Sequence, residues 1–81
     1  MKIINSAIKY KGKVYVGTRH ALIAEQIRKE VKGYKTRLEE QGFLTDTGKF
    51  VSREKAADIA FKAEQIPNGI YSLDSYQIFP L

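Results

Sequence analysis

The sequence predicts a small α+β domain of two β-hairpins and two α-helices in the order ββαββα, with a C-terminal tail strand and an antiparallel sheet packed on the helices. Two pairs of strand-like segments are each joined by a glycine-containing turn. Each pair is followed by a segment with apolar residues at helical spacing. The 81 residues contain no linker, repeat or low-complexity run, so a single domain is expected over residues 1–81.

The first hairpin is expected over residues 2–17. Apolar residues fall on both sides of the strand over residues 2–10, which is typical of a central strand. Alternation places four residues together on one side: Ile4, Ser6, Ile8 and Tyr10. Lys11 and Gly12 then supply a turn into a second strand over residues 13–17.

The first helix is expected to follow Thr18, a good N-cap residue, and to end at Gly33. Six residues fall at helical spacing over its turns, namely Leu22, Ile23, Gln26, Ile27, Val31 and Tyr34, and all but Gln26 are apolar or aromatic. The next segment, over residues 32–40, is polar and charged without clear periodicity. It is interpreted as a connection with room for one extra turn.

Residues 41–53 predict a second hairpin that leads into a helix over residues 54–66. Asp46 and Gly48 provide the chemistry of a tight turn, and Ser52 can cap the helix. Arg53 stands at the hairpin-to-helix junction, where unpaired backbone N–H groups can hold an anion. The helix carries a stripe of small and branched residues, namely Ala56, Ile59, Ala60, Ala63 and Ile66, with Phe61 beside it.

The C-terminal segment, residues 70–81, contains four large apolar or aromatic residues: Tyr71, Tyr76, Ile78 and Phe79. It is too apolar to extend freely into water. We expect it to add a strand to the sheet or to pack across a neighbouring subunit.

Composition narrows the classes of function. A chain of this length has a thin core, which favours an oligomer. The net charge of +5 favours an anionic partner, whether a nucleotide, a nucleic acid or an acidic protein surface. The first residues are too short and polar for a signal peptide, and no apolar run approaches the length of a membrane span. An intracellular protein without contact to the membrane is therefore expected.

Catalysis is not predicted. The chain has one histidine and no cysteine, so a nucleophile with its base and orienting acid is not apparent. Neither metal-ligand spacing nor a glycine-rich phosphate loop occurs, and no cofactor is expected. A binding protein is the expected class.

Several short motifs recur together in a group of small bacteriophage proteins. They are Arg19-His20 after a Gly-Thr turn, Gln41-Gly42-Phe43, Gly48-x-Phe50-x-x-Arg53, Ala56-Ala57-x-x-Ala60, Gln65-Ile66 and Tyr71-Ser72-x-Asp74. With these motifs, the chain resembles the Thoeris anti-defence sponges, which sequester a cyclic ADP-ribose isomer used as an immune signal. It departs from that group at Leu73, where similar proteins have Glu, in the added residues Gln77 to Leu81, and in its shorter length.

The resemblance implies a homo-oligomer in the cytoplasm of the infected bacterium, which binds a cyclic nucleotide between subunits without hydrolysing it. The cyclic ADP-ribose isomers and the cyclic oligonucleotides both remain candidates for the signal. The expected ligand-binding residues are Arg19, His20, Phe43, Phe50, Arg53, Gln65, Tyr71 and Asp74. The basic residues at the helix starts suit phosphates, the aromatic residues suit a base, and the polar ones suit its edges or the ribose.

Ordinary structural roles compete with these assignments. Core packing is the favoured role for Phe43 and Phe50, because both alternate with polar residues in short strands. Lone histidines such as His20 usually pack or cap, and an arginine at a helix start, such as Arg53, is more often solvated or paired with Glu54 or Asp58. Tyr71 can seal a subunit interface.

Two other classes of function remain open. Nucleic-acid binding is favoured by the basic residues of the N-terminal half, which are Lys9, Lys11, Lys13, Arg28, Lys29, Lys32, Lys35 and Arg37. Against it, Glu25 and Glu30 interrupt the basic residues of the first helix, and no helix-turn-helix or aromatic RNA-binding signature is present. The third class is a protein decoy that inhibits a host enzyme.

Overall fold

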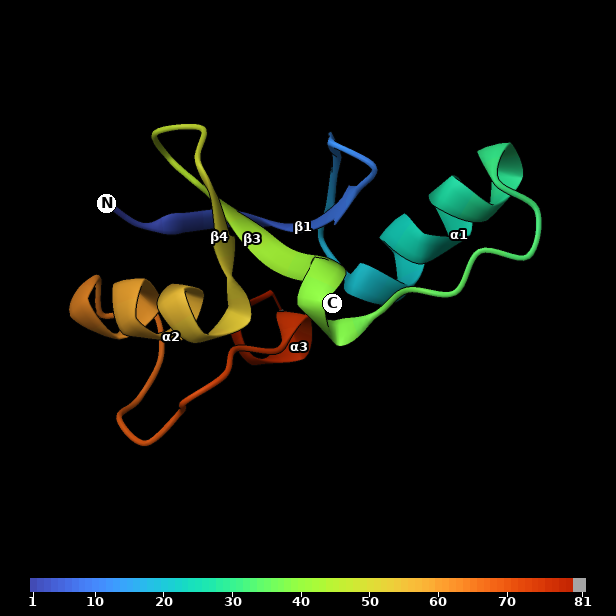
Figure 1. Ribbon diagram of the computed structural model, residues 1–81. Helices are drawn as coiled ribbons and strands as arrows, with labels where there is room; N and C mark the ends of the chain where they lie inside the picture. Colours follow the sequence, from blue (N-terminus) through green and yellow to red (C-terminus); the bar gives the residue numbers. More distant parts are fainter. Residues whose placement is uncertain (80–81) are drawn as a thin grey trace.

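A computed structural model of the protein describes residues 1–79 (Figure 1). The elements are β1 (Ile3–Tyr10), β2 (Lys13–Gly17), α1 (His20–Glu30), the 3₁₀ helix η1 (Leu38–Glu40), β3 (Gln41–Thr45), β4 (Phe50–Ser52), α2 (Arg53–Lys62) and α3 (Ser75–Ile78). The four strands form one antiparallel sheet in the order β2-β1-β3-β4. The predicted α+β fold with two hairpins and two main helices is confirmed. Among the described helices, none has both the length and the apolar character that a membrane crossing needs.

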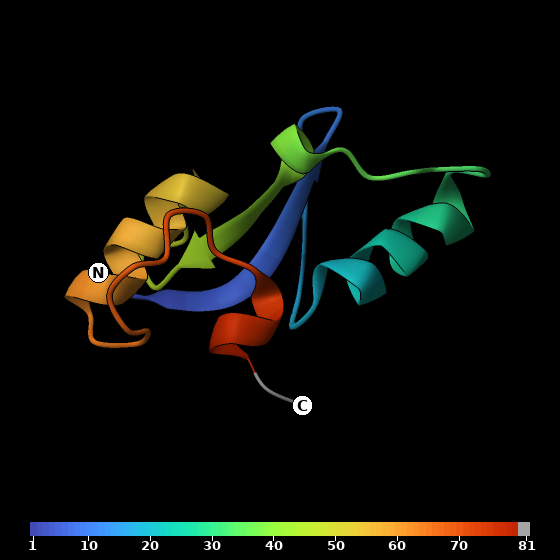
Figure 2. The same ribbon diagram turned by 90° about the horizontal axis from the view of Figure 1, so that it is seen from below.

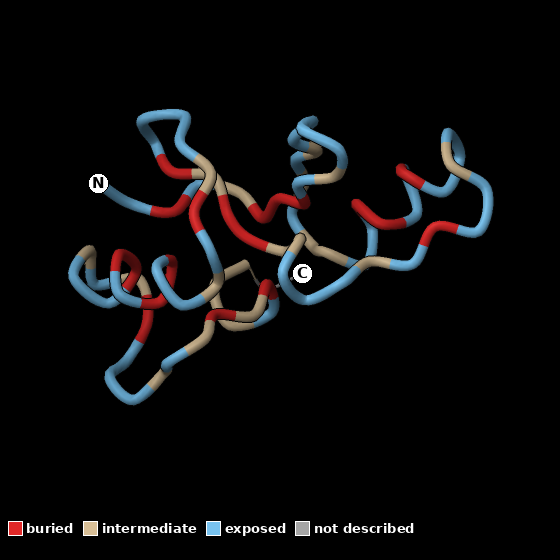
Figure 3. The backbone as a smooth tube through the Cα atoms, viewed as in Figure 1, coloured by how far each residue is buried: buried red, intermediate tan, exposed pale blue. Residues whose placement is uncertain are grey.

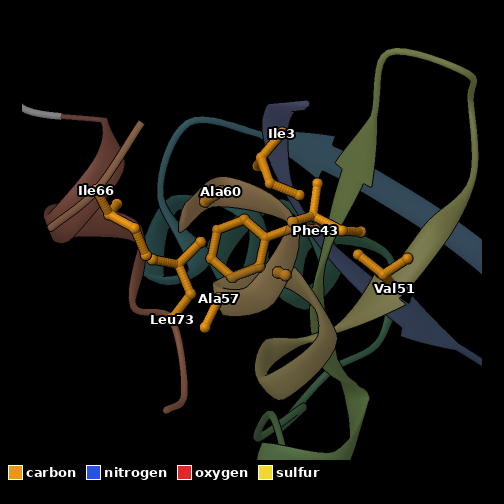
Figure 4. Packing of buried hydrophobic residues seen from close by; sticks show 9 residues of the cluster. Ile3, Phe43, Val51, Ala57, Ala60, Ile66 and Leu73 are labelled. Carbon is orange, nitrogen blue, oxygen red and sulfur yellow. The ribbon is translucent and has the colours of Figure 1, made fainter. Parts of the chain in front are cut away.

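Both main helices lie on the same side of the sheet, at opposite ends of a molecule that measures 38 × 23 × 20 Å (Figures 1 and 2). Each helix covers its own hydrophobic cluster. Ile8 of β1 packs with Ile23 and Ile27 of α1 in one cluster. Ile3 of β1 and Phe43 of β3 pack with the alanines of α2 in the other (Figure 4). Buried residues therefore concentrate along β1, β3 and the inner sides of the helices (Figure 3).

A β-bulge at Ile4 changes which residues of β1 face the helices. The pairing with β3 shifts register between Ile3 and Asn5, so Ile4 is an extra residue in the ladder. As a result Ile3, rather than Ile4, shares the helix side with Ser6 and Ile8. Ile3 is 2% exposed and Ile4 is 41% exposed. The predicted placement of Ile4 on the same side as Ser6 is therefore wrong.

The turn and capping predictions hold at three positions. Gly12 and Gly48 adopt positive φ angles of 80° and 81° in the two hairpin turns. The Ser52 hydroxyl accepts a hydrogen bond of 3.1 Å from the Lys55 backbone N–H, as an N-cap does. The first helix differs, because its N-cap is Arg19 rather than Thr18.

The helices are shorter than predicted, and α1 buries a narrower stripe. Helix α1 buries Ile23, Ala24 and Ile27, whereas Leu22 is 49% exposed, because only one side of the helix meets the sheet. Helix α2 ends at Lys62 because Glu64 adopts a positive φ of 60°. The backbone bonds from Glu64 to Phe61 and from residue 65 to residue 60 then close the helix end in a Schellman arrangement.

The C-terminal segment does not form the predicted tail strand. It runs back between the two helices on the helix side of the sheet and ends in the single turn α3 (Figure 2). Leu73 is fully buried in the α2 cluster, and its backbone N–H bonds the Arg53 carbonyl at 3.0 Å. The segment pairs with the start of α2 instead of a sheet edge because the side chain of Leu73 enters the core. Residues 80 and 81 of the predicted strand lie outside the described residues.

Candidate functional site

The starts of α1 and α2 meet the C-terminal segment between the two hydrophobic clusters. Six residues from β1, α1, α2 and the C-terminal segment make up what we name the helix-start cluster: Ser6, Arg19, His20, Arg53, Asp74 and Ser75. The cluster forms because each helix begins directly after a strand, so both N-termini emerge at the middle of the helix side of the sheet.

His20 is held at both nitrogens of its ring. Nε2 lies 2.7 Å from the carbonyl oxygen of Gly42 and donates to it, because a carbonyl oxygen only accepts. Nδ1 lies 2.7 Å from the hydroxyl of Ser75 and accepts its proton in the neutral ring. Burial lowers the pKa of His20 below 6.5, and the nearby Arg53 lowers it further, while the Gly42 carbonyl and Asp74 act in the opposite direction.

Two buried hydroxyls extend this network into the sheet. The Ser75 hydroxyl lies 2.8 Å from that of Ser6, and the Ser6 hydroxyl lies 2.9 Å from the Thr18 carbonyl. The backbone N–H of His20 also donates to Ser75, at 3.2 Å. Neither Ser6 nor Ser75 is among the ligand-binding residues predicted from the sequence. Ser6 could have been recognised from its position two residues before Ile8, which places a polar side chain on the buried side of β1.

Arg53 binds the C-terminal segment with two parts of its side chain. Nε donates to the Leu73 carbonyl at 3.0 Å, and one terminal nitrogen forms an ion pair with Asp74. Only 15% of the Arg53 side chain is exposed, against 39% for Asp74. The Asp74 carboxylate therefore accepts from one of the guanidinium donors of Arg53 that were predicted to bind a phosphate.

Arg19 also contacts the C-terminal segment, but more loosely. Its Nε donates to the carbonyl oxygen of Phe79 at 3.0 Å. Its two terminal nitrogens make no hydrogen bond within residues 1–79. This half-buried guanidinium keeps donors that can meet an anion.

Of the other four predicted ligand residues, Phe43 lies beside His20 and the remaining three lie elsewhere. Phe43 is fully buried and packs its ring edge-on against His20, with 5.0 Å between ring centroids. Gln65 forms two bonds to the backbone of Ile3, of 2.9 and 2.8 Å, and so ties α2 to β1. Phe50 projects from the side of the sheet opposite the helices, and Tyr71 is 88% exposed.

The structure thus brings together five of the eight predicted ligand residues: Arg19, His20, Phe43, Arg53 and Asp74. The other three, Phe50, Gln65 and Tyr71, lie apart from this group. Ligand binding by any of the eight stays a prediction.

An open hollow of about 230 Å³ lies elsewhere, between α2 and the loop over residues 67–71. The aromatic rings of Phe61 and Tyr71 line it together with the carboxylates of Glu54 and Asp58. An anion is disfavoured beside two carboxylates, so this hollow is unsuited to a phosphate group. Within residues 1–79, no three side chains of the His, Cys, Asp or Glu type gather in a way that could hold a metal ion.

A protein-family model described as Phage T4 y16D protein matches residues 2–79, which is nearly the whole chain. The bacteriophage part of the predicted resemblance is confirmed by this match. Comparison with curated proteins and with solved structures gives no match.

Proposed function

We propose that the chain, which belongs to the Phage T4 y16D protein family, is a phage anti-defence sponge of the Thoeris type. In this function it binds a cyclic nucleotide immune signal and withholds it from a host effector without hydrolysing it. The observation that carries the proposal is the convergence of Arg19 and Arg53 at the starts of two helices.

The chemistry of the helix-start cluster is compatible with phosphate binding. The Arg53 guanidinium pairs with the Asp74 carboxylate, and a phosphate oxygen makes the same kind of charge-assisted hydrogen bond. The helices α1 and α2, of 11 and 10 residues, add the partial positive charge of their N-termini. Two phosphates of one signal molecule would meet one arginine each.

Binding without turnover is consistent with the burial of Ser75 and with the hydrogen-bond partners of His20. The Ser75 hydroxyl touches His20, as in a nucleophile–base pair, but Ser75 is only 6% exposed. The second ring nitrogen of His20 is bound to a backbone carbonyl rather than to an orienting acid. A substrate atom has no access to this hydroxyl, which favours a structural role for the pair.

The proposal includes a homo-oligomer in the cytoplasm of the infected bacterium. The hollow beside α2 is acidic and lies away from the two arginines, so it does not offer them an enclosure. A second subunit placed over the helix-start cluster would supply the missing wall. The nucleotide would then be buried between subunits.

Isothermal titration of the purified protein with cyclic ADP-ribose isomers and cyclic di- and trinucleotides tests the proposal. We expect saturable binding of one signal, which is recovered intact after the protein is heated. Arg19→Gln should weaken binding about tenfold or more, because a hydrogen bond to a charged group is lost. Arg37→Gln is the matched control, since Arg37 is exposed and its one ion pair within residues 1–79 is with exposed Glu39, at 3.9 Å.

A second variant, Arg53→Lys, keeps the charge but removes the fork of donors that holds a phosphate. Circular dichroism must show the wild-type fold before its affinity is compared. Absence of binding to every member of the panel would reject the sponge. Unchanged affinity in both Arg19→Gln and Arg53→Lys would reject the assignment of phosphate binding to these two arginines. Native mass spectrometry of the same samples tests the oligomer separately.

A further inference from the structure

The side of the sheet opposite the helices is uncovered. Cross-strand pairing and alternation place six residues there that carry the inference, and we name this surface the open face: Asn5, Lys9, Val14, Val16, Leu44 and Phe50. Neither α1 nor α2 reaches this side, as Figures 1 and 2 show. Val14 is 36% exposed and Val16 39% exposed.

The centre of the open face is flat because two small residues, Ala7 and Gly42, are paired there. The Phe50 ring lies across the backbone of Gly42, where an added Cβ would collide with it. Its ring is half-buried, and the Lys9 ammonium lies 6.0 Å from the ring centroid. A planar ring beside a cation therefore stands on a flat, mostly apolar surface.

The charge of this surface indicates the partner. Among the residues of β1 to β4 that point to this side, Lys9 is the single charged one and no carboxylate is present. Lys11 lies in the adjoining hairpin turn, where its ammonium is 5.5 Å from the ring centroid of Tyr10, a residue that packs on the helix side. An anionic partner with flat apolar groups is complementary to this surface.

Size argues against a second copy of the chain as the occupant. Four strands spaced about 4.8 Å apart and about five residues long cover on the order of 250–300 Å². A stable protein interface buries about 800 Å² on each partner. The open face falls well short of this area, but it is large enough for a few nucleotides.

We propose that the open face binds single-stranded nucleic acid, with one base stacked on Phe50, where the Lys9 ammonium now lies over the ring, and with the phosphate backbone beside Lys9. Base stacking on an aromatic ring needs a flat accessible face, and phosphates need cations next to it. Val14, Val16 and Leu44 extend the apolar floor for neighbouring bases. This binding is independent of the sponge, because the helix-start cluster lies on the other side of the sheet.

Fluorescence polarisation with labelled oligothymidylate and oligouridylate tests this inference and separates DNA from RNA. Phe50→Leu should weaken binding about 5- to 150-fold, the range for loss of one base stack. Lys9→Gln should weaken it less and reduce the slope of log affinity against log salt by about 0.7. Lys55→Gln is the matched control, because Lys55 is an exposed cation on α2.

Val16→Glu is a second variant, which places a carboxylate on the β2 edge of the open face, next to Ala7, and should abolish binding if the nucleic acid lies there. Absence of binding to both oligonucleotides would overturn the inference. Equal losses in Lys9→Gln and Lys55→Gln would also overturn it, because binding would then follow net charge alone. A concentration-dependent dimer that Val16→Glu dissociates, without nucleic-acid binding, would assign the face to a second copy. Arg19→Gln should leave oligonucleotide affinity unchanged, so failure of the sponge and failure of this inference are distinguishable.

Discussion

Replacing Arg53 with alanine should detach the C-terminal segment from the rest of the fold. The change removes the bond to the Leu73 carbonyl and the ion pair with Asp74, and leaves a carbonyl in a half-buried position without its donor. A hydrogen bond to a charged group contributes about 1.5–3 kcal/mol. The ion pair adds little, because Asp74 is 39% exposed and solvent screens it.

We therefore expect Arg53→Ala to lower the free energy of unfolding by about 2 kcal/mol. In a domain of this size each kcal/mol shifts the melting temperature by about 4–8 °C, so the loss should be roughly 10 °C. Thermal denaturation followed by circular dichroism measures this shift. Arg37→Ala is the control and should change the free energy of unfolding by less than about 0.5 kcal/mol, because its ion pair is exposed. If the two variants melt together, Arg53 does not anchor the segment.

Three further outcomes test the packing and the polar network. The pKa of His20 is lower in the folded protein than in the unfolded chain, so as the pH falls the unfolded chain binds a proton at His20 before the folded protein does. The urea midpoint should therefore fall as the pH drops below about 6.5 and be level above it. His20→Gln should lose much of this dependence. Gly42→Ala should destabilise the fold by about 1–3 kcal/mol or more in urea denaturation, because its Cβ collides with the Val51 carbonyl oxygen and with the Phe50 ring; an unchanged midpoint would contradict this packing. Gln65→Ala should lose about 1–2 kcal/mol in the same assay through its two bonds to Ile3, and Gln26→Ala, on exposed helix surface, should not.

Local signals predicted the parts of the fold that depend on neighbouring residues. Glycine in the hairpin turns and Ser52 at the start of α2 act within three or four residues, so the sequence is sufficient to recognise them. The bulge at Ile4 gives no such signal, because Ile3 and Ile4 are identical side chains. Only the packing of α2 against the sheet decides which isoleucine turns inward.

The candidate site was partly predictable for the same reason. Arg53 is recognisable from its place before a helix, whereas its partners at positions 73 and 74 lie 20 and 21 residues away. The C-terminal segment was expected to add a strand or to pack across a neighbouring subunit because it is too apolar to extend freely into water. The buried side chain of Leu73 instead draws it across α2, a long-range preference that periodicity does not report.

Both hydrophobic clusters share β1, with Ile3 at one end and Ile8 at the other. Neither half of the molecule can lose its core without disturbing the strand on which the other half is built. Opening of one end therefore propagates to the other, and the domain should unfold in a single cooperative transition despite its two separate cores. The slowest amide hydrogen exchange is expected in β1, since its backbone is released only in that transition.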